Sequence, residues 1–427
     1  MILKAKCYNG MEKQELKALI AEYQQFVSMV QVMKRPVELE ANGNYVFVGL
    51  RRAGKSYLLY QLIQEKLQSG ISIEQILFVN FEDERFIGTE TKDLNEILEA
   101  YREMYDREPI LFLDEVQVVA GWQNFVRRLA DTRHSVYVSG SNAEMLSSEI
   151  ATTLGGRFLI YEVYPYSFSE YLAVNGVSLP RNWEFNSIKN KVVQLGEEYF
   201  RYGGLPEIID IRNKRPWLSS LYQKIFFGDI VTRYSIRNDD ALKLMIKKLT
   251  ESVMHPVSYN RIANITSASG SKISVSTTVE YLKYLVASWL IFSVSNYASA
   301  LSEKESLKKY YFIDNGILNL FLVNGNARLL ENLVAITLYK RYEEQLYYYS
   351  QNVDVDLYIP SEELAVQVSY DISDMKTLDR ETTALVKLRN VFPNLQAWLV
   401  TYNEERTIIQ DGCKIRVVPF WKWLLLY

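Results

Sequence analysis

The stretch that decides the fold of this chain is Gly49-Leu50-Arg51-Arg52-Ala53-Gly54-Lys55-Ser56. Its spacing, G-x-x-x-x-G-K-[ST], is that of a loop that wraps phosphate groups. Glycines let the backbone curl so that its N–H groups point at phosphate oxygens, and a following helix adds its positive N-terminal end. The motif requires a strand before it and a helix after it. The apolar run Tyr45–Val48 and the amphipathic run Lys55–Leu67 meet both requirements.

The loop indicates a nucleoside triphosphate bound with a divalent ion. Lys55 is placed to reach the β- and γ-phosphates and Ser56 to ligate Mg²⁺, so we expect ATP and Mg²⁺ as cofactors. We expect Tyr57 and all the other loop residues to contact the nucleotide as well, namely Gly49, Leu50, Arg51, Arg52, Ala53 and Gly54. The side chains of the two arginines either touch phosphate or are solvated. An ordinary glycine-containing turn is the alternative interpretation of the whole motif.

A second apolar run, Ile110–Leu113, ends in two acids, Asp114 and Glu115. In such an arrangement the first acid holds Mg²⁺, usually through water, and the second acts on the attacking water. A carboxylate at the carboxyl end of a strand faces the crevice where phosphates bind. A solvated acidic turn is the alternative, and the phosphate loop earlier in the chain argues against it. We therefore expect Asp114 to be a metal ligand and Glu115, together with Lys55, to be catalytic.

Two later segments hold further candidates. The strand predicted at Val136–Ser139 runs into Gly140, Ser141 and Asn142, and a polar side chain there is placed to reach the γ-phosphate or the attacking water. The candidates are Ser139, Ser141 and Asn142. A helix N-cap is the alternative role for Ser141 or Asn142. Arg157 follows two glycines and is a candidate catalytic residue that stabilises transition-state charge. A surface ion pair is the plainer interpretation of that arginine.

The composition excludes several classes of protein. The 427 residues carry a net charge of -3, so any DNA contact needs a local basic patch rather than a global field. Two cysteines and two histidines argue against a disulfide framework and against a zinc or histidine-rich metal site. No apolar run is long enough to span a membrane. With no apolar leader at the N-terminus, a cytoplasmic protein without membrane contact is expected.

The order of the predicted elements divides the chain into three domains. Strands alternate with helices up to residue 165, which predicts a parallel sheet with helices on both faces. Residues 166–250 read as helices, a smaller Ser- and Thr-rich unit follows, and strands return from residue 307. We expect a phosphate-loop domain over 1–175, a mainly helical region over 176–300 and an α/β domain over 301–427.

Ten stretches occur along the chain in the order VGLRRAGKSYLL, LFVNFEDERF, ILFLDEVQ, VSGSNAEML, LGGR, EVYPYSFSEYL, YGGLPE, SYNRIANITSASGSKISVSTTVEYLKYL, YFIDNGI and LLENLVAITLYKR. With these stretches the chain resembles the prokaryotic AAA-type ATPases that carry a C-terminal domain of unknown function related to restriction endonucleases. The resemblance implies an α/β fold with a P-loop NTPase parallel sheet, then a helical and winged-helix-like region, then a restriction-endonuclease-like domain. AAA-type relatives often assemble so that an arginine of one subunit meets the neighbour's ATP. The resemblance therefore makes a homo-oligomer one option and leaves two roles open for Arg157, action in cis or action in trans.

The middle region supports a helix-turn-helix-like unit independently. Tyr259–Asn264 and Val275–Leu285 are two amphipathic runs joined through Ser269-Gly270-Ser271. The second run carries Glu280 and Lys283 and no arginine. Reading of DNA and packing against a protein partner both remain open for this unit.

The resemblance also implies a nuclease pattern in the C-terminal domain, which this sequence only partly carries. Such a nuclease holds Mg²⁺ with acidic residues and a Glu-x-Lys on one strand. Glu331 and Asp356 match the acidic positions, but Gln367 and Ser369 stand where Glu and Lys are needed. Glutamine is a poor magnesium ligand, and serine supplies no positive charge. Nuclease activity is therefore not expected.

The leading interpretation is an ATPase that hydrolyses ATP with Mg²⁺ to change the conformation of appended DNA- or protein-binding domains. A nucleotide-gated switch or scaffold with little turnover is the first alternative. An ATP-dependent nuclease is the second.

Overall fold

The computed structural model describes residues 11–142, 145 and 148–427. Residues 143, 144 and 146 of the stretch VSGSNAEML therefore lie outside the described part. The chain divides into two compact units, residues 1–163 and residues 164–427. Within the described ranges no helix has the length and apolar character needed to cross a membrane.

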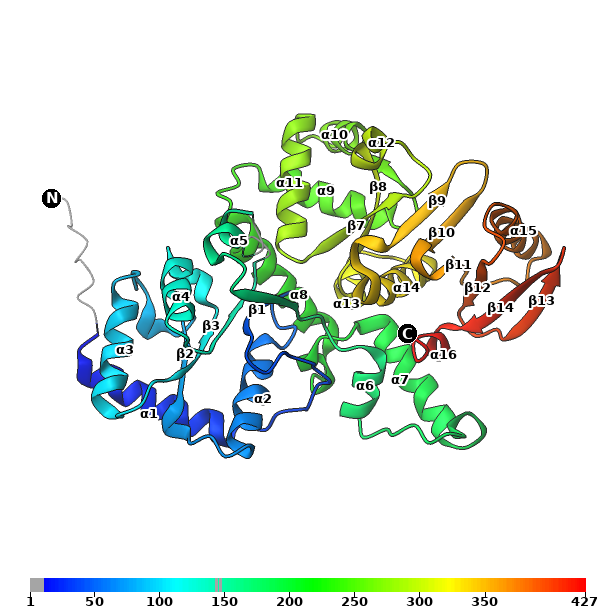
Figure 1. Cartoon of the computed structure of the whole chain (residues 1–427). Helices are drawn as coiled ribbons and strands as arrows, with labels where there is room; N and C mark the ends of the chain where they lie inside the picture. The colour runs from blue at the N-terminus through cyan, green and yellow to red at the C-terminus, as the bar shows by residue number, and fades with distance from the viewer. Residues whose placement is uncertain (1–10, 143–144, 146–147) are drawn as a thin grey trace. The chain divides into compact units, whose positions relative to one another are not determined.

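The first unit is built on a five-stranded parallel sheet with the strand order β2-β3-β4-β1-β5 (Figure 1). Its strands are β1 (Asn44–Val48), β2 (Ile76–Asn80), β3 (Ile110–Asp114), β4 (Val136–Gly140) and β5 (Phe158–Glu162). The first four are almost continuously buried, as expected of parallel strands covered on both faces. The prediction of a P-loop NTPase sheet is confirmed, with every predicted strand of this unit present.

Helices flank this sheet. They are α1 (Lys13–Met29), α2 (Lys55–Gln68), α3 (Asp93–Met104), α4 (Trp122–Asp131) and α5 (Ser148–Leu154). Helix α1 starts with a capping box formed by Glu12 and Glu15. It buries one apolar stripe, which includes Leu16, Ile20 and Val27, and it packs on β2.

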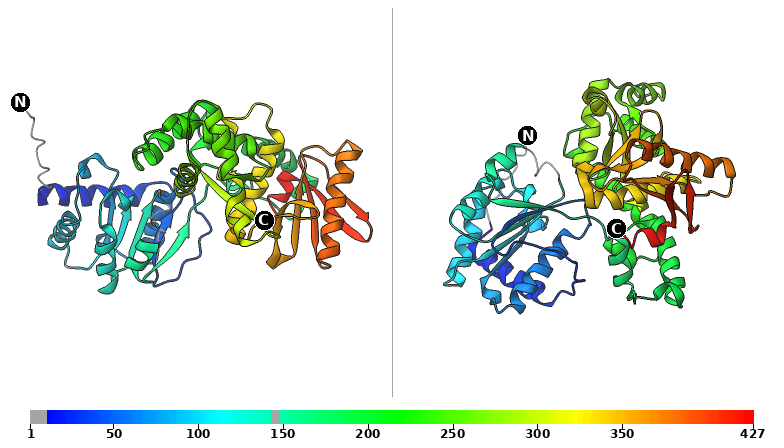
Figure 2. Two further views of the ribbon diagram at one scale, coloured as in Figure 1. Left: turned by 90° about the horizontal axis from the view of Figure 1, so that it is seen from above. Right: turned by 45° about the vertical axis from the view of Figure 1, so that its right-hand side comes forward.

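The second unit starts with helices and continues with a mixed sheet. Its helices are α6 (Phe168–Val174), α7 (Ile188–Tyr202), α8 (Lys214–Lys224), a π-helix (Ile225–Thr232), α9 (Asp239–Ser252), α10 (Tyr259–Ala268), α11 (Val275–Ala287), α12 (Leu301–Ser306), α13 (Asn315–Asn319), α14 (Asn326–Tyr342), α15 (Met375–Val391) and α16 (Phe420–Trp423). Helix α15 packs on the strands formed by the last part of the chain, chiefly β12 and β14 (Figure 2).

The sheet of the second unit has nine strands in the order β13-β14-β12-β11-β10-β9-β7-β8-β6. The strands are β6 (Val257–Ser258), β7 (Ile291–Asn296), β8 (Leu307–Phe312), β9 (Tyr347–Ser350), β10 (Asp354–Ile359), β11 (Leu364–Val368), β12 (Gln396–Thr401), β13 (Arg406–Gln410) and β14 (Cys413–Pro419). This mixed sheet makes the C-terminal region α/β, as predicted. The sheet crosses the domain boundary predicted at residue 300, because β7, which precedes this residue, pairs in parallel with β9, which follows it. The three-domain division stays a prediction.

One buried carboxylate ties two distant segments of the second unit together. Asp314 accepts hydrogen bonds from the backbone N–H groups of Gly316 at 2.8 Å and Ile317 at 3.2 Å and thereby caps α13. It also accepts the N–H of Gly204 at 2.9 Å. The stretches YGGLPE and YFIDNGI, both noted in the sequence, therefore form one structural feature.

Candidate active site

The phosphate loop is the tight connection between β1 and α2 (Figure 1). Three of its residues have positive φ, namely Gly49 at 152°, Arg52 at 63° and Gly54 at 101°. A Cβ at position 49 would lie 2.1 Å from the carbonyl oxygen of Val163, so only glycine fits there. The left-handed conformation of Arg52 is costly for a residue with a side chain, and such strain concentrates at functional sites. The backbone is thus curled as a phosphate-binding loop requires.

Lys55 is the first residue of α2 and its side chain is only 3% exposed. Its ammonium group donates to the carbonyl oxygens of Gly49 and Leu50, at 3.2 Å each. The same ammonium lies 3.4 Å from Oε1 of Glu115. The cation predicted to bind phosphate and the acid predicted to act on water are therefore direct neighbours.

The strand order explains why residues far apart in sequence meet here. Strand β4 lies between β1 and β3, in the register Val48 with Gly140 and Leu113 with Val138. Because the carboxyl ends of parallel strands share one edge, the loop after β1, the acids after β3 and the polar residues after β4 converge. Ser56 hydrogen-bonds the Asp114 carboxylate, so the two predicted magnesium ligands are also adjacent.

A dense hydrogen-bond network holds the acid pair. The Ser139 hydroxyl donates to Asp114 and accepts the Glu115 N–H at 3.1 Å. Oε2 of Glu115 accepts the N–H of Ser141 at 3.2 Å and the amide of Gln117 at 2.6 Å. Glu115 itself has a φ of 51°, which turns the chain sharply after the strand. The predicted residue Ser141 is part of the site, and both its backbone N–H and its side chain contact the Glu115 carboxylate.

Gln117 was missed by the sequence reasoning. Its side chain bridges Glu115 and the Ser141 hydroxyl, the latter at 3.5 Å. The only signal was its place two residues after the acid pair, where a glutamine is not distinctive. Gly140 makes room for it, since a Cβ there would lie 2.4 Å from Oε1 of Gln117.

The surroundings shift the pKa values of Asp114 and Glu115 in opposite directions. Burial and the neighbouring Glu115 carboxylate raise the pKa of Asp114. Burial acts in the same direction on Glu115, but Lys55 and the Gln117 amide outweigh it and lower the pKa of that carboxyl. Glu115 is therefore ionised at neutral pH and able to accept a hydrogen bond from water. Paired carboxyl groups with separated proton affinities are typical of sites that divide acid and base roles.

The other predicted residues lie around this centre or away from it. The Arg51 guanidinium pairs with Glu82 at 2.7 Å, after the end of β2. Tyr57 is half-exposed on α2. Arg157 precedes β5, and its carbonyl accepts a bond from Asn44 at the first residue of β1. Arg157 therefore lies at the amino end of the strands, opposite the phosphate loop, and its side chain pairs with Asp131. The structure does not bring Arg157 to the loop of its own chain.

The predicted nuclease positions are brought together in the second unit. Asp356 on β10 lies beside Gln367 on β11, whose Oε1 accepts the Asp356 N–H at 2.7 Å. Glu331 on α14 is fully buried and meets the same group of residues through Lys309. Ser369 follows β11 and donates to the carbonyl oxygen of Asp371 at 3.1 Å.

Comparisons with known proteins match both parts of the chain. The AAA domain family matches residues 41–172, and a domain of unknown function (DUF8612) matches residues 194–328. The chain is similar to the uncharacterized protein MJ1544 of Methanocaldococcus jannaschii, with 33% identity over 427 residues that cover 96% of this chain and 95% of that protein. An uncharacterized protein of Haemophilus influenzae is 32% identical over 88% of this chain and 93% of its own length. Among solved structures, a Walker-type ATPase of Pyrococcus abyssi aligns with a TM-score of 0.41 and 14% identity, over 75% of this chain and 99% of that one.

Proposed function

Because the chain belongs to the prokaryotic AAA-type P-loop ATPases, in one family with the Methanocaldococcus jannaschii protein, we propose that it binds ATP with Mg²⁺ and hydrolyses it. The observation that carries this proposal is the placement of Glu115. An ionised carboxylate is fixed at the carboxyl edge of the sheet, 3.4 Å from the ammonium of the phosphate-loop lysine. That is the position in which a base acts on a water molecule that attacks a bound γ-phosphate.

Each residue of the site takes one role in this proposal. The loop N–H groups and Lys55 hold the β- and γ-phosphates and offset charge that develops on them. Ser56 and Asp114 offer two hard oxygen ligands side by side, which fits Mg²⁺, and the ion would supply charge neutralisation at the phosphates. Glu115 orients the attacking water and takes its proton. Gln117 and the Ser141 N–H are positioning groups that fix the Glu115 carboxylate.

We further propose that turnover changes the conformation of the regions that follow the ATPase domain. In the element order β6-α10-α11-β7-β8, strand β8 pairs antiparallel with both β6 and β7, which supports a winged-helix-like unit. The exposed positions of α11 include Glu280 and Lys283, so charge alone favours neither DNA nor a protein partner. We also propose that the chain forms a homo-oligomer, that it is cytoplasmic and that its last domain is restriction-endonuclease-like.

The test is phosphate release from Mg-ATP by the full chain, compared with Lys55→Ala. We expect the variant to lose at least about 100-fold in turnover, since the loop lysine acts on the charge of the transition state. Lys13→Ala is the matched control, because Lys13 is a half-exposed lysine that pairs with Glu99 and Glu103 on the surface. Equal turnover in Lys55→Ala and the wild type would remove the assignment of the loop.

A second arm of the same experiment asks whether the ATPase acts on DNA or on a protein partner. Turnover is measured with single-stranded DNA, with double-stranded DNA and without DNA, at two salt concentrations. Stimulation that weakens with salt would identify a machine that acts on nucleic acid, because phosphate contacts are salt-dependent. Unchanged turnover in all arms would favour a protein-directed machine.

A further inference from the structure

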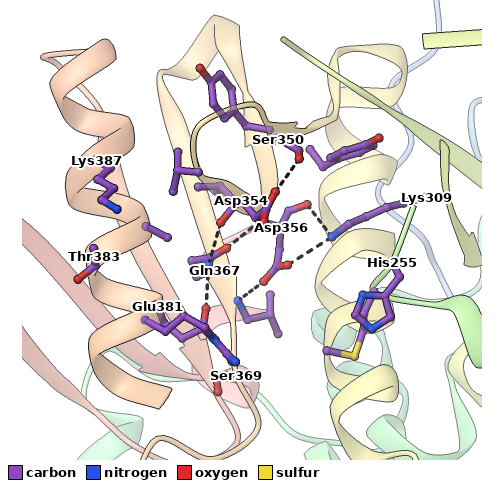
Figure 3. Close-up of a pocket in the computed structure, with 18 of the residues that line it drawn as sticks. His255, Lys309, Ser350, Asp354, Asp356, Gln367, Ser369, Glu381, Thr383 and Lys387 are labelled. Carbon is purple, nitrogen blue, oxygen red and sulfur yellow. Dashed lines mark hydrogen bonds and ion pairs between the residues drawn. The ribbon is translucent and has the colours of Figure 1, made fainter. Parts of the chain in front are cut away.

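The second unit contains a cavity of about 780 Å³ that the proposed ATPase function does not use. It is lined by the β9–β10 hairpin, by β11 and α15, by the loop before β6, and by Lys309 of β8 (Figure 3). Asp356, Gln367 and Glu381 point toward one another in this cavity, and Lys309 reaches Asp356 from the opposite side (Figure 3). Asp356, Gln367 and Ser369, three positions of the nuclease pattern, therefore lie with Glu381 at the floor of an open space. Glu331 is fully buried and is not part of this floor.

The Lys309 ammonium lies between the carboxylates of Glu331 and Asp356. Its ammonium nitrogen lies 3.0 Å from Oε1 of Glu331 and 3.3 Å from Oδ1 of Asp356. It lies 3.5 Å from the carbonyl oxygen of Asp356 as well. Burial works against the charge of Lys309, but the Glu331 and Asp356 carboxylates outweigh it and raise the pKa of the ammonium to about 12. A permanent positive charge thus sits between the two acids.

These oxygens form the kind of set that binds a hard divalent cation. Two carboxylates and a backbone carbonyl are ligands that Mg²⁺, Mn²⁺ and Ca²⁺ prefer, at roughly 2.0–2.6 Å. The oxygens around the Lys309 nitrogen are about one ångström farther out, as hydrogen bonds require. In the described part of the chain, Oε2 of Glu331 is buried and has no hydrogen-bond partner. One further oxygen is therefore available for a metal in this place.

The remaining carboxylate of the floor is also neutralised from within the chain. Glu381 on α15 accepts the amide of Gln367 at 2.8 Å and pairs with Arg380 at 2.5 Å. The second oxygen of Asp356 accepts the N–H of Val368 at 3.0 Å. Each acidic side chain at the floor thus has a cation or an N–H group of this chain as its partner. An external metal ion would therefore contribute little further stabilisation of these carboxylates.

We propose that Lys309 is a built-in cation whose ammonium group takes the place of a divalent metal ion between Glu331 and Asp356. The natural cavity is then a metal-independent site, and removal of the ammonium uncovers a divalent-cation site made of Glu331 and Asp356. This role goes beyond ATP hydrolysis and does not depend on it. It also explains how Glu331 and Asp356 lie close together although Gln367 and Ser369 stand at the other two positions of the nuclease pattern.

The test measures Mn²⁺ binding to the full chain by calorimetry, in an Asp114→Asn background that removes the metal ligand of the ATP site. Lys309→Met in this background is expected to gain one Mn²⁺ site at least about tenfold tighter than any site of the parent. Lys309→Arg is the matched control, because it keeps the positive charge and should gain none. Adding Asp356→Asn to Lys309→Met should abolish the gained site.

Two results would overturn the proposal. One is a folded Lys309→Met protein, checked by circular dichroism, that binds no additional Mn²⁺. The other needs no substitution of Lys309: the parent and its Asp356→Asn variant should bind Mn²⁺ equally, since the ammonium already fills the place. A loss of Mn²⁺ binding on Asp356→Asn alone would show that the natural cavity is a metal site. This second comparison holds even where Lys309→Met fails to fold.

Discussion

The Lys55 ammonium lies 3.4 Å from the Glu115 carboxylate, so the two residues that are proposed to bind phosphate and to act on water form an ion pair. Both side chains are nearly buried, which strengthens their attraction. A triphosphate must compete with Glu115 for the same ammonium. Under the proposed function, ATP would draw Lys55 to phosphate and leave Glu115 held by Gln117 and the Ser141 N–H.

The first prediction concerns Glu115→Gln. Because the neutral amide no longer competes for Lys55, we expect ATP to bind severalfold more tightly. Turnover should fall by about 10²–10⁴-fold, the usual contribution of a general base. Equilibrium binding of ATP and single-turnover hydrolysis measure the two effects separately. Glu103→Gln, an exposed acid that pairs with Lys13 and Lys17, is the matched control. A switch with little natural turnover would show tighter binding but no change in hydrolysis.

The second prediction concerns the charge of Asp114 and its dependence on pH. Burial and Glu115 raise the pKa of Asp114 from 3.8 to about 6, so the folded chain holds this proton more tightly than the unfolded chain. The resulting stability is present below the unfolded pKa and is lost as pH rises through the folded pKa. Asp114→Asn has no titratable group at this position, so its folding stability should not fall in this way as the pH rises. We expect it to stabilise the ATPase unit by about 1–3 kcal/mol near pH 7.5 and to give no gain near pH 4.

Thermal unfolding of the nucleotide-free protein at both pH values tests this expectation. The same variant should lose the Mg²⁺ dependence of ATP binding, because Asp114 is the proposed metal ligand. An equal shift in unfolding temperature at the two pH values would contradict the assigned proton affinity. It would leave the magnesium role untouched.

The third prediction concerns Arg51 and Glu82. The Arg51 guanidinium is held by Glu82 at 2.7 Å and also helps to lower the pKa of Glu115, so its charge acts within the site. We expect Arg51→Ala to lower kcat/KM for ATP by about 10–100-fold and Arg51→Lys to recover only part, since lysine lacks the planar fork. Glu82→Gln removes the ion pair that holds the Arg51 guanidinium and should therefore lower the KM for ATP.

Steady-state kinetics of the three variants separate these effects. Arg102→Ala is the control, since Arg102 is an exposed arginine with its own acidic partner, Glu108. If Arg51→Ala and Arg102→Ala have the same kcat/KM, the Arg51 side chain does not act on the nucleotide.

The fourth prediction concerns Arg157. This residue lies at the amino end of the sheet, so a role at a phosphate requires the ATP site of a neighbouring subunit. Arg157→Ala and Lys55→Ala should each be inactive alone. Mixed together they should recover activity, because a Lys55→Ala subunit still supplies Arg157 to an intact ATP site. Arg128→Ala, a change on the exposed face of α4, should behave as wild type. A mixture no more active than the sum of its parts would reject action in trans.

The candidate ATP site could be predicted because its signals are local. The phosphate loop and the acid pair each occupy a few consecutive residues whose spacing has a direct chemical meaning. The parallel strands, whose order the structure supplies, then bring them together. Gln117 escaped prediction because a single glutamine after an acid carries no distinctive pattern.

The second unit was less predictable for a physical reason. Lys309 lies on β8, and its partners Glu331 and Asp356 lie on α14 and β10. Nothing in the local sequence around a lysine shows that its charge will be buried between two acids. The contact between Gly204 and Asp314 has the same character, since it joins segments more than a hundred residues apart. Such pairings arise from the packing of the whole unit and become visible only in three dimensions.

The last prediction tests that long-range contact. Gly203 has a φ of 76°, and a Cβ there would lie 2.1 Å from the Asp314 carboxylate. Gly176 has a φ of 71° and open space around it. The backbone of Gly203 (φ 76°, ψ −166°) lies in a region that is almost confined to glycine, so alanine there meets a larger backbone cost than the roughly 1–2 kcal/mol of an ordinary left-handed residue. Only Gly203→Ala also pushes Asp314 away from the N–H groups of Gly204 and Gly316, which leaves buried donors unsatisfied at about 1–3 kcal/mol each.

We therefore expect Gly203→Ala to destabilise the second unit by at least about 3 kcal/mol, and Gly176→Ala by about one third of that. Urea denaturation measures the difference, and hydrogen exchange locates it. The amides of Gly204 and Gly316 should lose protection in Gly203→Ala and keep it in Gly176→Ala. Equal protection of these two amides in the two variants would mean that backbone strain alone acts, and that Asp314 does not hold the two segments together.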